Sequence, residues 1–198
     1  MRTALYAATI GLAAFEVIVL WFALHPSVPA NYRAYYIDRT TTCLDQPVPG
    51  TYSGGLVSFL YDGRQAARPL KVCGWEGPAG DGTHAVGSSS RLRFTPAKQI
   101  EDAVLVLKMR AIGRDGMPDQ VVTVSFDGKS LADLEVTSES ELVYEIPLGR
   151  NVGPDDGPLE IELGFPKALR MGQTDPSTRW RSIKLTAAGL LPGKNAGD

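Results

Sequence analysis

Hydrophobic and polar positions divide the chain into two parts of different character. Residues 3–24 contain no Lys, Arg or Asp. A helix over this stretch, rising about 1.5 Å per residue, is long enough to cross the ~30 Å hydrocarbon core of a bilayer. Tyr6 and Trp21 lie near its two ends, where aromatic rings favour the level of the lipid headgroups. This pattern predicts a transmembrane anchor over residues 1–25.

A cleaved signal peptide is the alternative interpretation of the same stretch. The small residues of SVPA, which ends at Ala30, would suit cleavage. The apolar stretch is nevertheless longer than the roughly 7–15 residues of a signal-peptide core, which favours an uncleaved anchor. Arg2 precedes the span and Arg33 and Arg39 follow it, so the basic residues alone do not set its orientation.

The remainder of the chain has the composition and alternation of β-strands. Residues 26–50 are rich in proline and keep no sustained period, which predicts a linker. Beyond them, short β-type runs recur between turn signals. The even-numbered residues of 122–126 share one apolar face, as do the odd-numbered residues of 159–163, and Asp127-Gly128 is a strong hairpin signal.

These runs predict an all-β fold preceded by a single N-terminal transmembrane helix. The expected architecture over residues 51–190 is an antiparallel β-sandwich or jelly roll, because many short strands follow one another without a long helical segment. Residues 191–198 are expected to form a flexible tail. The 21 glycines and 14 prolines agree with a fold that has many turns.

Charge and cysteine content limit the classes of partner and indicate the cellular compartment of the domain. The formal net charge is −2 and the basic residues are scattered singly, which predicts no nucleic-acid partner and no phosphate-binding patch. Cys43 and Cys73 both follow the apolar segment, and in a turn-rich β domain they favour an oxidising compartment. We therefore predict a Cys43–Cys73 disulfide, a cytoplasmic amino terminus and a periplasmic or extracellular domain.

Signatures of catalysis and of metal binding are weak. His84 is the one candidate base in the domain, and its surroundings, GDGTHAVGSSS, predict a Gly-rich loop. No pair of acids stands out for glycoside hydrolysis, so the sequence predicts a protein that is not an enzyme. Asp155 and Asp156 could ligate a hard cation, but an acidic surface turn is the commoner case. No metal or other cofactor is predicted.

Aromatic residues supply the candidate ligand-binding positions. An exposed Trp on a β-sandwich can stack on the apolar face of a sugar ring, and Trp75 and Trp180 both lie in the domain. His84 and Arg91 are the candidate polar partners in such a glycan site. A buried role that stabilises the sandwich is the alternative for each Trp.

Four segments between residues 72 and 188 resemble a known family: GWEGPAGDGTHAVGSSSRLRF, VTVSFDGKSLADLEV, LEIELGFPKAL and DPSTRWRSIKL. They are similar to a jelly-roll domain, like a carbohydrate-binding module, of bacterial envelope polysaccharide systems. Such domains are appended to, or encoded beside, membrane-embedded glycosyltransferases that make exopolysaccharides. The resemblance implies β architecture and a glycan-related role, and it supplies no catalytic residue.

The expected function follows from the anchor and the resemblance together. We expect a single-pass protein of the bacterial inner membrane that is an accessory subunit of a polysaccharide-synthesising glycosyltransferase. A β-glucan synthase of the curdlan or cellulose kind is one such partner, and the domain would guide or weakly bind the emerging polysaccharide. A free-standing carbohydrate-binding module tethered to the lipid bilayer is the alternative.

Glu16 is the polar exception within the anchor. The apolar side chains of residues 3–24 contribute about −3 to −6 kcal/mol to insertion, which offsets the roughly 2.5–3.5 kcal/mol cost of a charged residue near the centre. Helical spacing places Thr9, Ala13 and Glu16 on one small, polar face, which lets a neighbouring helix approach. We expect Glu16 to dock on a partner's transmembrane helix; a protonated Glu16 that faces lipid is the alternative.

Overall fold

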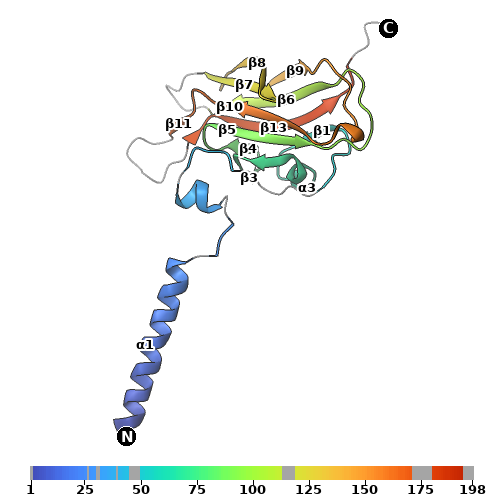
Figure 1. Ribbon diagram of the computed structural model, residues 1–198. Coiled ribbons are helices and arrows are strands. Elements are labelled where there is room, and N and C mark those ends of the chain that lie inside the picture. Colours follow the sequence, from blue (N-terminus) through green and yellow to red (C-terminus); the bar gives the residue numbers. More distant parts are fainter. Residues whose placement is uncertain are drawn as a thin grey trace.

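The chain forms one long N-terminal helix and one β-sandwich, seen together in Figure 1. The computed structural model describes residues 2–25, 27–29, 32–38, 40–44, 50–112, 119–170 and 180–193. Within these ranges the side chains of residues 2–5, 35, 78, 169, 170 and 180 are not described.

Helix α1 spans Arg2–Leu24, 23 residues without a break. At about 1.5 Å per residue it is about 34 Å long. Its section Tyr6–Leu24 is long and apolar enough to cross a membrane, and the rest of the protein buries none of it. At its end the His25 ring stacks on Trp21, and His25 Nδ1 lies 3.0 Å from the Trp21 carbonyl oxygen. The predicted single apolar helix is confirmed.

Two antiparallel sheets make up the sandwich (Figure 1). The strands of the first sheet are β1 (Gly55–Ser58), β3 (Trp75–Ala79), β4 (Gly82–Ala85), β6 (Val104–Ala111), β9 (Leu142–Pro147) and β13 (Ile183–Leu191). Their order is β3-β4-β13-β6-β9, and β1 pairs with the later part of β13.

The second sheet has the order β2-β5-β10-β7-β8. Its strands are β2 (Lys71–Cys73), β5 (Ser89–Phe94), β7 (Gln120–Phe126), β8 (Lys129–Val136) and β10 (Leu159–Gly164). A small ladder joins β11 (Leu169–Arg170) to β12 (Trp180–Arg181). The short helical segments are η1 (Arg33–Ile37), α3 (Arg64–Ala67), η2 (Arg68–Leu70) and η3 (Pro154–Asp156).

The apolar faces that the sequence predicts form part of the core between the sheets. Val122 and Val124 on β7 are fully buried, and Phe126 packs against the core from a partly exposed position. The odd-numbered residues of 159–163 on β10 are buried as well. Asp127 and Gly128 form the turn between β7 and β8, with φ of 48° and 73°. Positive φ at both positions is what Asp-Gly favours in a two-residue hairpin, so this prediction is confirmed.

The surroundings of His84 are a hairpin and not the Gly-rich loop that the sequence analysis predicts. Strands β3 and β4 pair with each other, and β4 pairs with β13, where His84 lies opposite Lys184. Gly82 has φ of 123°, and a Cβ there would lie 2.7 Å from the Leu185 carbonyl oxygen. This glycine therefore allows β13 to approach closely. The loop prediction was wrong because it treated the glycine as a loop residue.

The segment predicted as a linker contacts the sandwich in its described part. The Thr41 carbonyl oxygen accepts hydrogen bonds from the Ser88 backbone N–H at 3.1 Å and from Ser88 Oγ at 2.9 Å. Gly87 has φ of 93°, and a Cβ there would lie 2.7 Å from the same carbonyl oxygen. Cys43 and Cys73 form the predicted disulfide, with a Cα–Cα distance of 5.4 Å. Residues 40–44 are therefore fastened to the sandwich at the ends of β2 and β4.

The disulfide should supply a large share of the stability of the domain. It closes a sequence separation of 30 residues. The chain-entropy relation gives about 3–4 kcal/mol for a loop of that length. We expect the Cys43→Ala/Cys73→Ala variant to lose that amount in urea unfolding of the full chain in neutral detergent, and reduced wild-type protein to match the variant. Free-thiol labelling of unfolded, unreduced protein should find no thiol; two reactive thiols would contradict the assignment.

Candidate functional site

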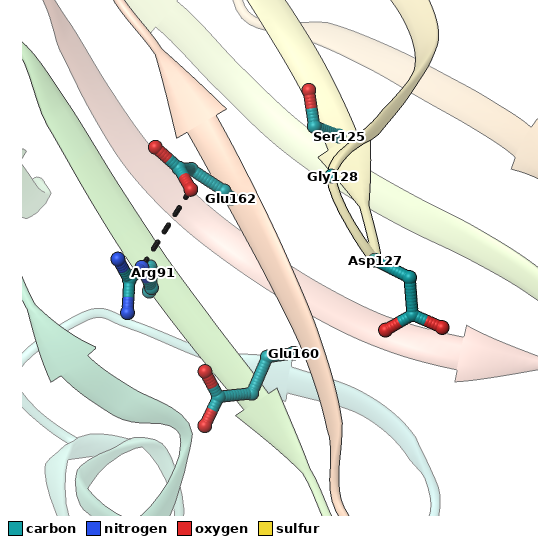
Figure 2. Close-up of a pocket in the computed structure, with 6 residues that line it drawn as sticks. All are labelled: Arg91, Ser125, Asp127, Gly128, Glu160 and Glu162. Carbon is teal, nitrogen blue, oxygen red and sulfur yellow. Dashed lines mark ion pairs between the residues drawn. The ribbon is translucent and has the colours of Figure 1, made fainter.

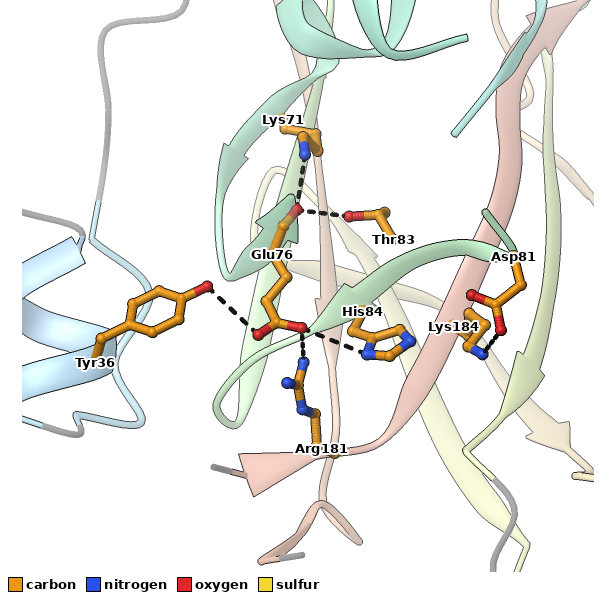
Figure 3. A network of polar contacts seen from close by, with 8 residues as sticks. All are labelled: Tyr36, Lys71, Glu76, Asp81, Thr83, His84, Arg181 and Lys184. Carbon is orange, nitrogen blue, oxygen red and sulfur yellow. Dashed lines mark hydrogen bonds and ion pairs between the residues drawn. The ribbon is translucent and has the colours of Figure 1, made fainter. Parts of the chain in front are cut away.

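A polar cluster around Glu76 joins the segment after the anchor to the sandwich (Figure 3). Glu76 lies on β3, and its side chain is 16% exposed. Arg181 from β12, also 16% exposed, forms an ion pair and hydrogen bond with Glu76 Oε2. His84 Nδ1 lies 3.4 Å from the same oxygen, and the Tyr36 hydroxyl from η1 donates to Oε1 at 3.4 Å. Three segments distant in the sequence thus converge on one carboxylate.

The backbone carbonyl of Glu76 is the second acceptor of the cluster. Lys71 Nζ donates to it at 2.8 Å and Thr83 Oγ1 at 2.7 Å. Burial lowers the pKa of the Lys71 ammonium to about 8, and the charge of Glu76 partly opposes this shift. Lys71 is therefore a cation that the fold holds in a partly dehydrated position.

His84 contributes a second unusual group. His84 Nδ1 faces the Glu76 carboxylate, so Nδ1 carries a proton that points toward Glu76 Oε2. Nε2 is buried and has no hydrogen-bond partner among the described residues. Beside it, Lys184 forms an ion pair with Asp81, and this hydrogen bond lowers the pKa of the Asp81 carboxyl. The cluster links β3, β4, β12 and η1 through charge and hydrogen bonding.

An open pocket of about 190 Å³ lies on the outer face of the second sheet (Figure 2). Arg91 Nε lies 3.6 Å from Glu162 Oε2, and Arg93 Nε donates to Glu160 at 2.7 Å next to it. The pocket has hydrogen-bonding groups suited to hydroxyls, and none of the described residues that line it is aromatic. Its lining residues are Arg91, Ser125, Asp127, Gly128, Glu160 and Glu162.

The predicted glycan-binding residues lie at separate places. His84 belongs to the first sheet and Arg91 to the second. The Trp75 ring packs against the core near Phe59, with 6.5 Å between the ring centroids, and its Nε1–H donates to the Arg91 carbonyl oxygen at 2.9 Å. Trp75 thus bridges the two sheets at their edge. Trp180 pairs with Arg170 through its backbone, and its side chain lies outside the described part. A glycan-binding role for all four stays a prediction.

In the acidic turn at Asp155 and Asp156, the Asp156 side chain stabilises the local backbone. Asp156 Oδ2 accepts the Gly153 backbone N–H at 2.7 Å at the start of η3, and Asp156 Oδ1 accepts from Arg150 at 2.9 Å. Among the residues that the structure describes, no group of three or more His, Cys, Asp or Glu side chains is arranged to hold a metal ion.

Sequence reasoning missed Glu76, Tyr36 and Arg181. The contacts of Glu76 with Tyr36 and Arg181 span 40 and 105 positions of sequence. No local pattern marks such pairs, because only the pairing of β4 with β13 and the fastening of residues 40–44 bring them together.

Comparison with known proteins gives no family. No protein-family model matches the chain, and no curated protein matches it. Among solved structures it is similar to a carbohydrate-binding module, CBM36, in complex with calcium and xylotriose, with a TM-score of 0.35, 10% identity, and coverage of 75% of this chain and 98% of that one. It is also similar to CsCBM6-3 from Clostridium stercorarium in complex with cellobiose, with a TM-score of 0.33, 11% identity, and coverage of 77% and 94%.

A third similar structure is the mosquito-larvicidal Cry4Aa toxin from Bacillus thuringiensis, with a TM-score of 0.38 and 8% identity. The match covers 57% of this chain and only 19% of the toxin. All three TM-scores lie below 0.5 and all three identities below 25%. No ligand, residue role or activity is therefore carried over to this chain.

The Glu76–Arg181 ion pair should contribute more to the free energy of unfolding than an exposed ion pair between the same residue types. Glu76→Gln removes the negative charge that pairs with Arg181 in a largely buried setting. Hydrogen bonds to charged groups contribute about 1.5–3 kcal/mol there, so the variant should lose stability on that scale. The control is Glu162→Gln, because Glu162 pairs with Arg91 at 3.6 Å while 48% exposed, and such pairs contribute below about 1 kcal/mol. Urea unfolding of both variants should show this order; equal losses would contradict it.

Lys71 should make stability depend on pH in the alkaline range. Its pKa is about 8 in the folded chain against an ordinary 10.5, so between these values the unfolded chain binds the extra proton and the stability of the wild type rises with pH. We expect Lys71→Met to be more stable than wild type at pH 7, and the difference to shrink as the pH rises from 8 to 10.5. Urea unfolding in neutral detergent measures this, with Lys98→Met as the control; a difference that does not change with pH would contradict the burial of the charge.

Proposed function

We propose that this protein is a membrane-anchored, extracytoplasmic accessory subunit of a polysaccharide-synthesising glycosyltransferase complex. Its anchor would dock on a transmembrane helix of the enzyme, and its sandwich would guide or weakly bind the emerging polysaccharide. A β-glucan synthase of the curdlan or cellulose kind is the partner class that the sequence resemblance implies. This proposal assigns the chain no chemical step of its own.

The observation that carries the proposal is that the segment after α1 is fastened to the sandwich. A freely tethered binding module needs only a long linker, and its orientation is of no consequence. Here Tyr36, Thr41 and Cys43 are held to the sandwich by the Tyr36–Glu76 hydrogen bond, the two contacts of Thr41 and the Cys43–Cys73 disulfide. Such fastening suits a domain that must lie at a set place over a partner in the membrane.

The polar face of α1 supplies the second support. The helix runs unbroken from Arg2 to Leu24, so Thr9, Ala13 and Glu16 lie along one face at helical spacing. No part of the sandwich covers Ala13 or Glu16, which are exposed in the described chain. A carboxyl group in the hydrocarbon core gains from a hydrogen-bonding partner on a second helix, and small residues beside it allow the close approach.

The compartment follows from two features of the chain. The apolar N-terminal helix, as a signal or an anchor, and the disulfide together indicate an extracytoplasmic domain. We place the protein in the bacterial inner membrane as a single-pass protein, with its amino terminus in the cytoplasm and its sandwich in the periplasm. The emerging polysaccharide would then leave the enzyme on the side where the sandwich lies.

Glu16→Leu should separate docking from folding. The variant keeps an apolar helix and should insert fully, while a lost interhelical hydrogen bond, about 0.6–2 kcal/mol in membranes, weakens the complex by roughly three- to thirtyfold. The measurements are co-purification of the glycosyltransferase from mild detergent and the polymer yield of the cells. Glu16→Gln should keep most of the interaction, because its amide still forms hydrogen bonds.

The matched control is Ile18→Ala, which lies on the opposite side of α1 and should leave co-purification unchanged. If Glu16→Leu retains its partner and the full polymer yield, the docking role of Glu16 is wrong. If wild-type protein brings down no glycosyltransferase but binds glycan, the chain is instead a free-standing, membrane-tethered carbohydrate-binding module.

A further inference from the structure

A group of basic side chains lies at α3 and η2, where the sequence analysis expects no phosphate-binding patch. Arg64 and Arg68 lie four residues apart in consecutive helical turns, and Lys71 follows as the first residue of β2. All three line one pocket. Ala67 and Leu70, at 2% and 1% exposure, are buried and fix the direction of these turns. Arg64 and Arg68 are therefore exposed, and Lys71 lies next to them in a partly buried position.

These residues line an open pocket of about 330 Å³ whose fourth lining residue is Gln65. None of these four described residues carries a carboxylate. Among the described residues, no acid forms an ion pair with Arg64 or Arg68, and the neighbouring Asp62 carboxylate accepts the Gly63 backbone N–H at 2.8 Å. The pocket therefore gathers three cationic groups, of which Lys71 also feels the charge of Glu76 from outside the pocket.

Two of the cations are held in place. The Arg64 guanidinium lies 4.5 Å from the centre of the Tyr61 ring, a stacking contact that leaves its N–H donors available in the plane of the group. Lys71 Nζ is fixed by its hydrogen bond to the Glu76 carbonyl oxygen. Burial lowers the pKa of Lys71 to about 8, so a bound anion would relieve a charge that the fold leaves under-compensated. Guanidinium groups match the oxygens of a phosphate in geometry as well as in charge.

The pocket lies on the side of the sandwich that faces the membrane anchor. Figure 1 shows α3 and β3 on the side of the domain toward α1. Lys71 shares Glu76 with Tyr36 of the segment that leaves the membrane, and Lys71 lies two residues before Cys73 of the fastening disulfide. A lipid headgroup is thus the phosphate source nearest to this pocket when α1 spans a bilayer.

We propose that Arg64, Arg68 and Lys71 form a binding site for a phosphate group, supplied by an anionic glycerophospholipid, which holds the sandwich against the membrane surface. The site needs no partner protein, so it goes beyond the accessory role proposed above and does not depend on it. Its binding is electrostatic and should weaken as salt is added.

The test uses the full-length chain in lipid nanodiscs and follows backbone hydrogen exchange of residues 60–71. In discs of phosphatidylcholine with about a third phosphatidylglycerol, we expect exchange to slow by roughly fivefold or more relative to pure phosphatidylcholine, since each basic residue at an anionic surface contributes about a factor of five. In Arg64→Gln/Arg68→Gln, both exposed positions, this protection should disappear. The matched control is Lys98→Gln/Lys129→Gln, which removes the same charge from exposed positions elsewhere and should keep the protection.

A second arm distinguishes the sources of phosphate. Inorganic phosphate added to pure phosphatidylcholine discs should protect the segment only weakly. If it protects as well as the anionic lipid does, the lipid assignment is overturned. Protection lost equally in both double variants would mean a diffuse surface effect, and no protection in the wild type would mean no site; either result overturns the proposal. Unchanged urea unfolding of the variants in neutral discs confirms that they are folded.

Discussion

The largely buried carboxylate of Glu76 is the group on which the packing of the segment after α1 against the sandwich depends. A carboxylate that is 16% exposed needs partners, and the chain supplies them from three directions: Arg181, His84 and Tyr36. Each partner belongs to a different segment, so the electrostatic requirement of one residue orders all three. The disulfide keeps residues 40–44 near the sandwich, but a single covalent link permits rotation. The added contacts to Glu76 and Ser88 restrict that rotation.

The contacts around Glu76 limit how the polar face of α1 and the surfaces of the sandwich can be placed relative to each other in the proposed complex. The segment around Tyr36 connects α1, which carries Glu16, to the sandwich (Figure 1). In the proposed complex, docking of the helix would therefore also set which edge of the sandwich lies nearest to the enzyme. A module on a long flexible linker would gain local concentration only, whereas a fastened module can also present a defined surface.

Periodicity predicted the fold wherever one side of a strand is buried. The alternation over residues 122–126 and the Asp127-Gly128 turn are local consequences of pleating and of backbone φ, so they are visible in the sequence. The β3–β4 hairpin was missed because Gly82 is needed there for the close approach of Leu185, and composition alone treats glycine as a loop residue. The Glu76 cluster could not be predicted, since its contacts depend on strand pairing over long separations. The basic pocket was missed because Arg64 and Arg68 lie in helical segments of only four and three residues, and Lys71 belongs to the strand that follows.

The uneven distribution of charge would orient the sandwich near an anionic surface, an effect that the net charge of the chain does not reveal. The chain as a whole carries −2, yet the pocket toward the anchor has three cations and no acid, while the pocket at Asp127 has three carboxylates and one guanidinium. Strands β7 and β8, whose turn contains Asp127, lie on the side of the sandwich away from α1 (Figure 1). Near an anionic surface the first group is attracted and the second is repelled, within a Debye length of about 8 Å at physiological salt. The basic side lies toward α1 (Figure 1), so if α1 spans the membrane as proposed, electrostatics and the fastening at Glu76 would favour the same orientation. In that arrangement the acidic face with groups suited to hydroxyls would be the one exposed on the side away from the membrane.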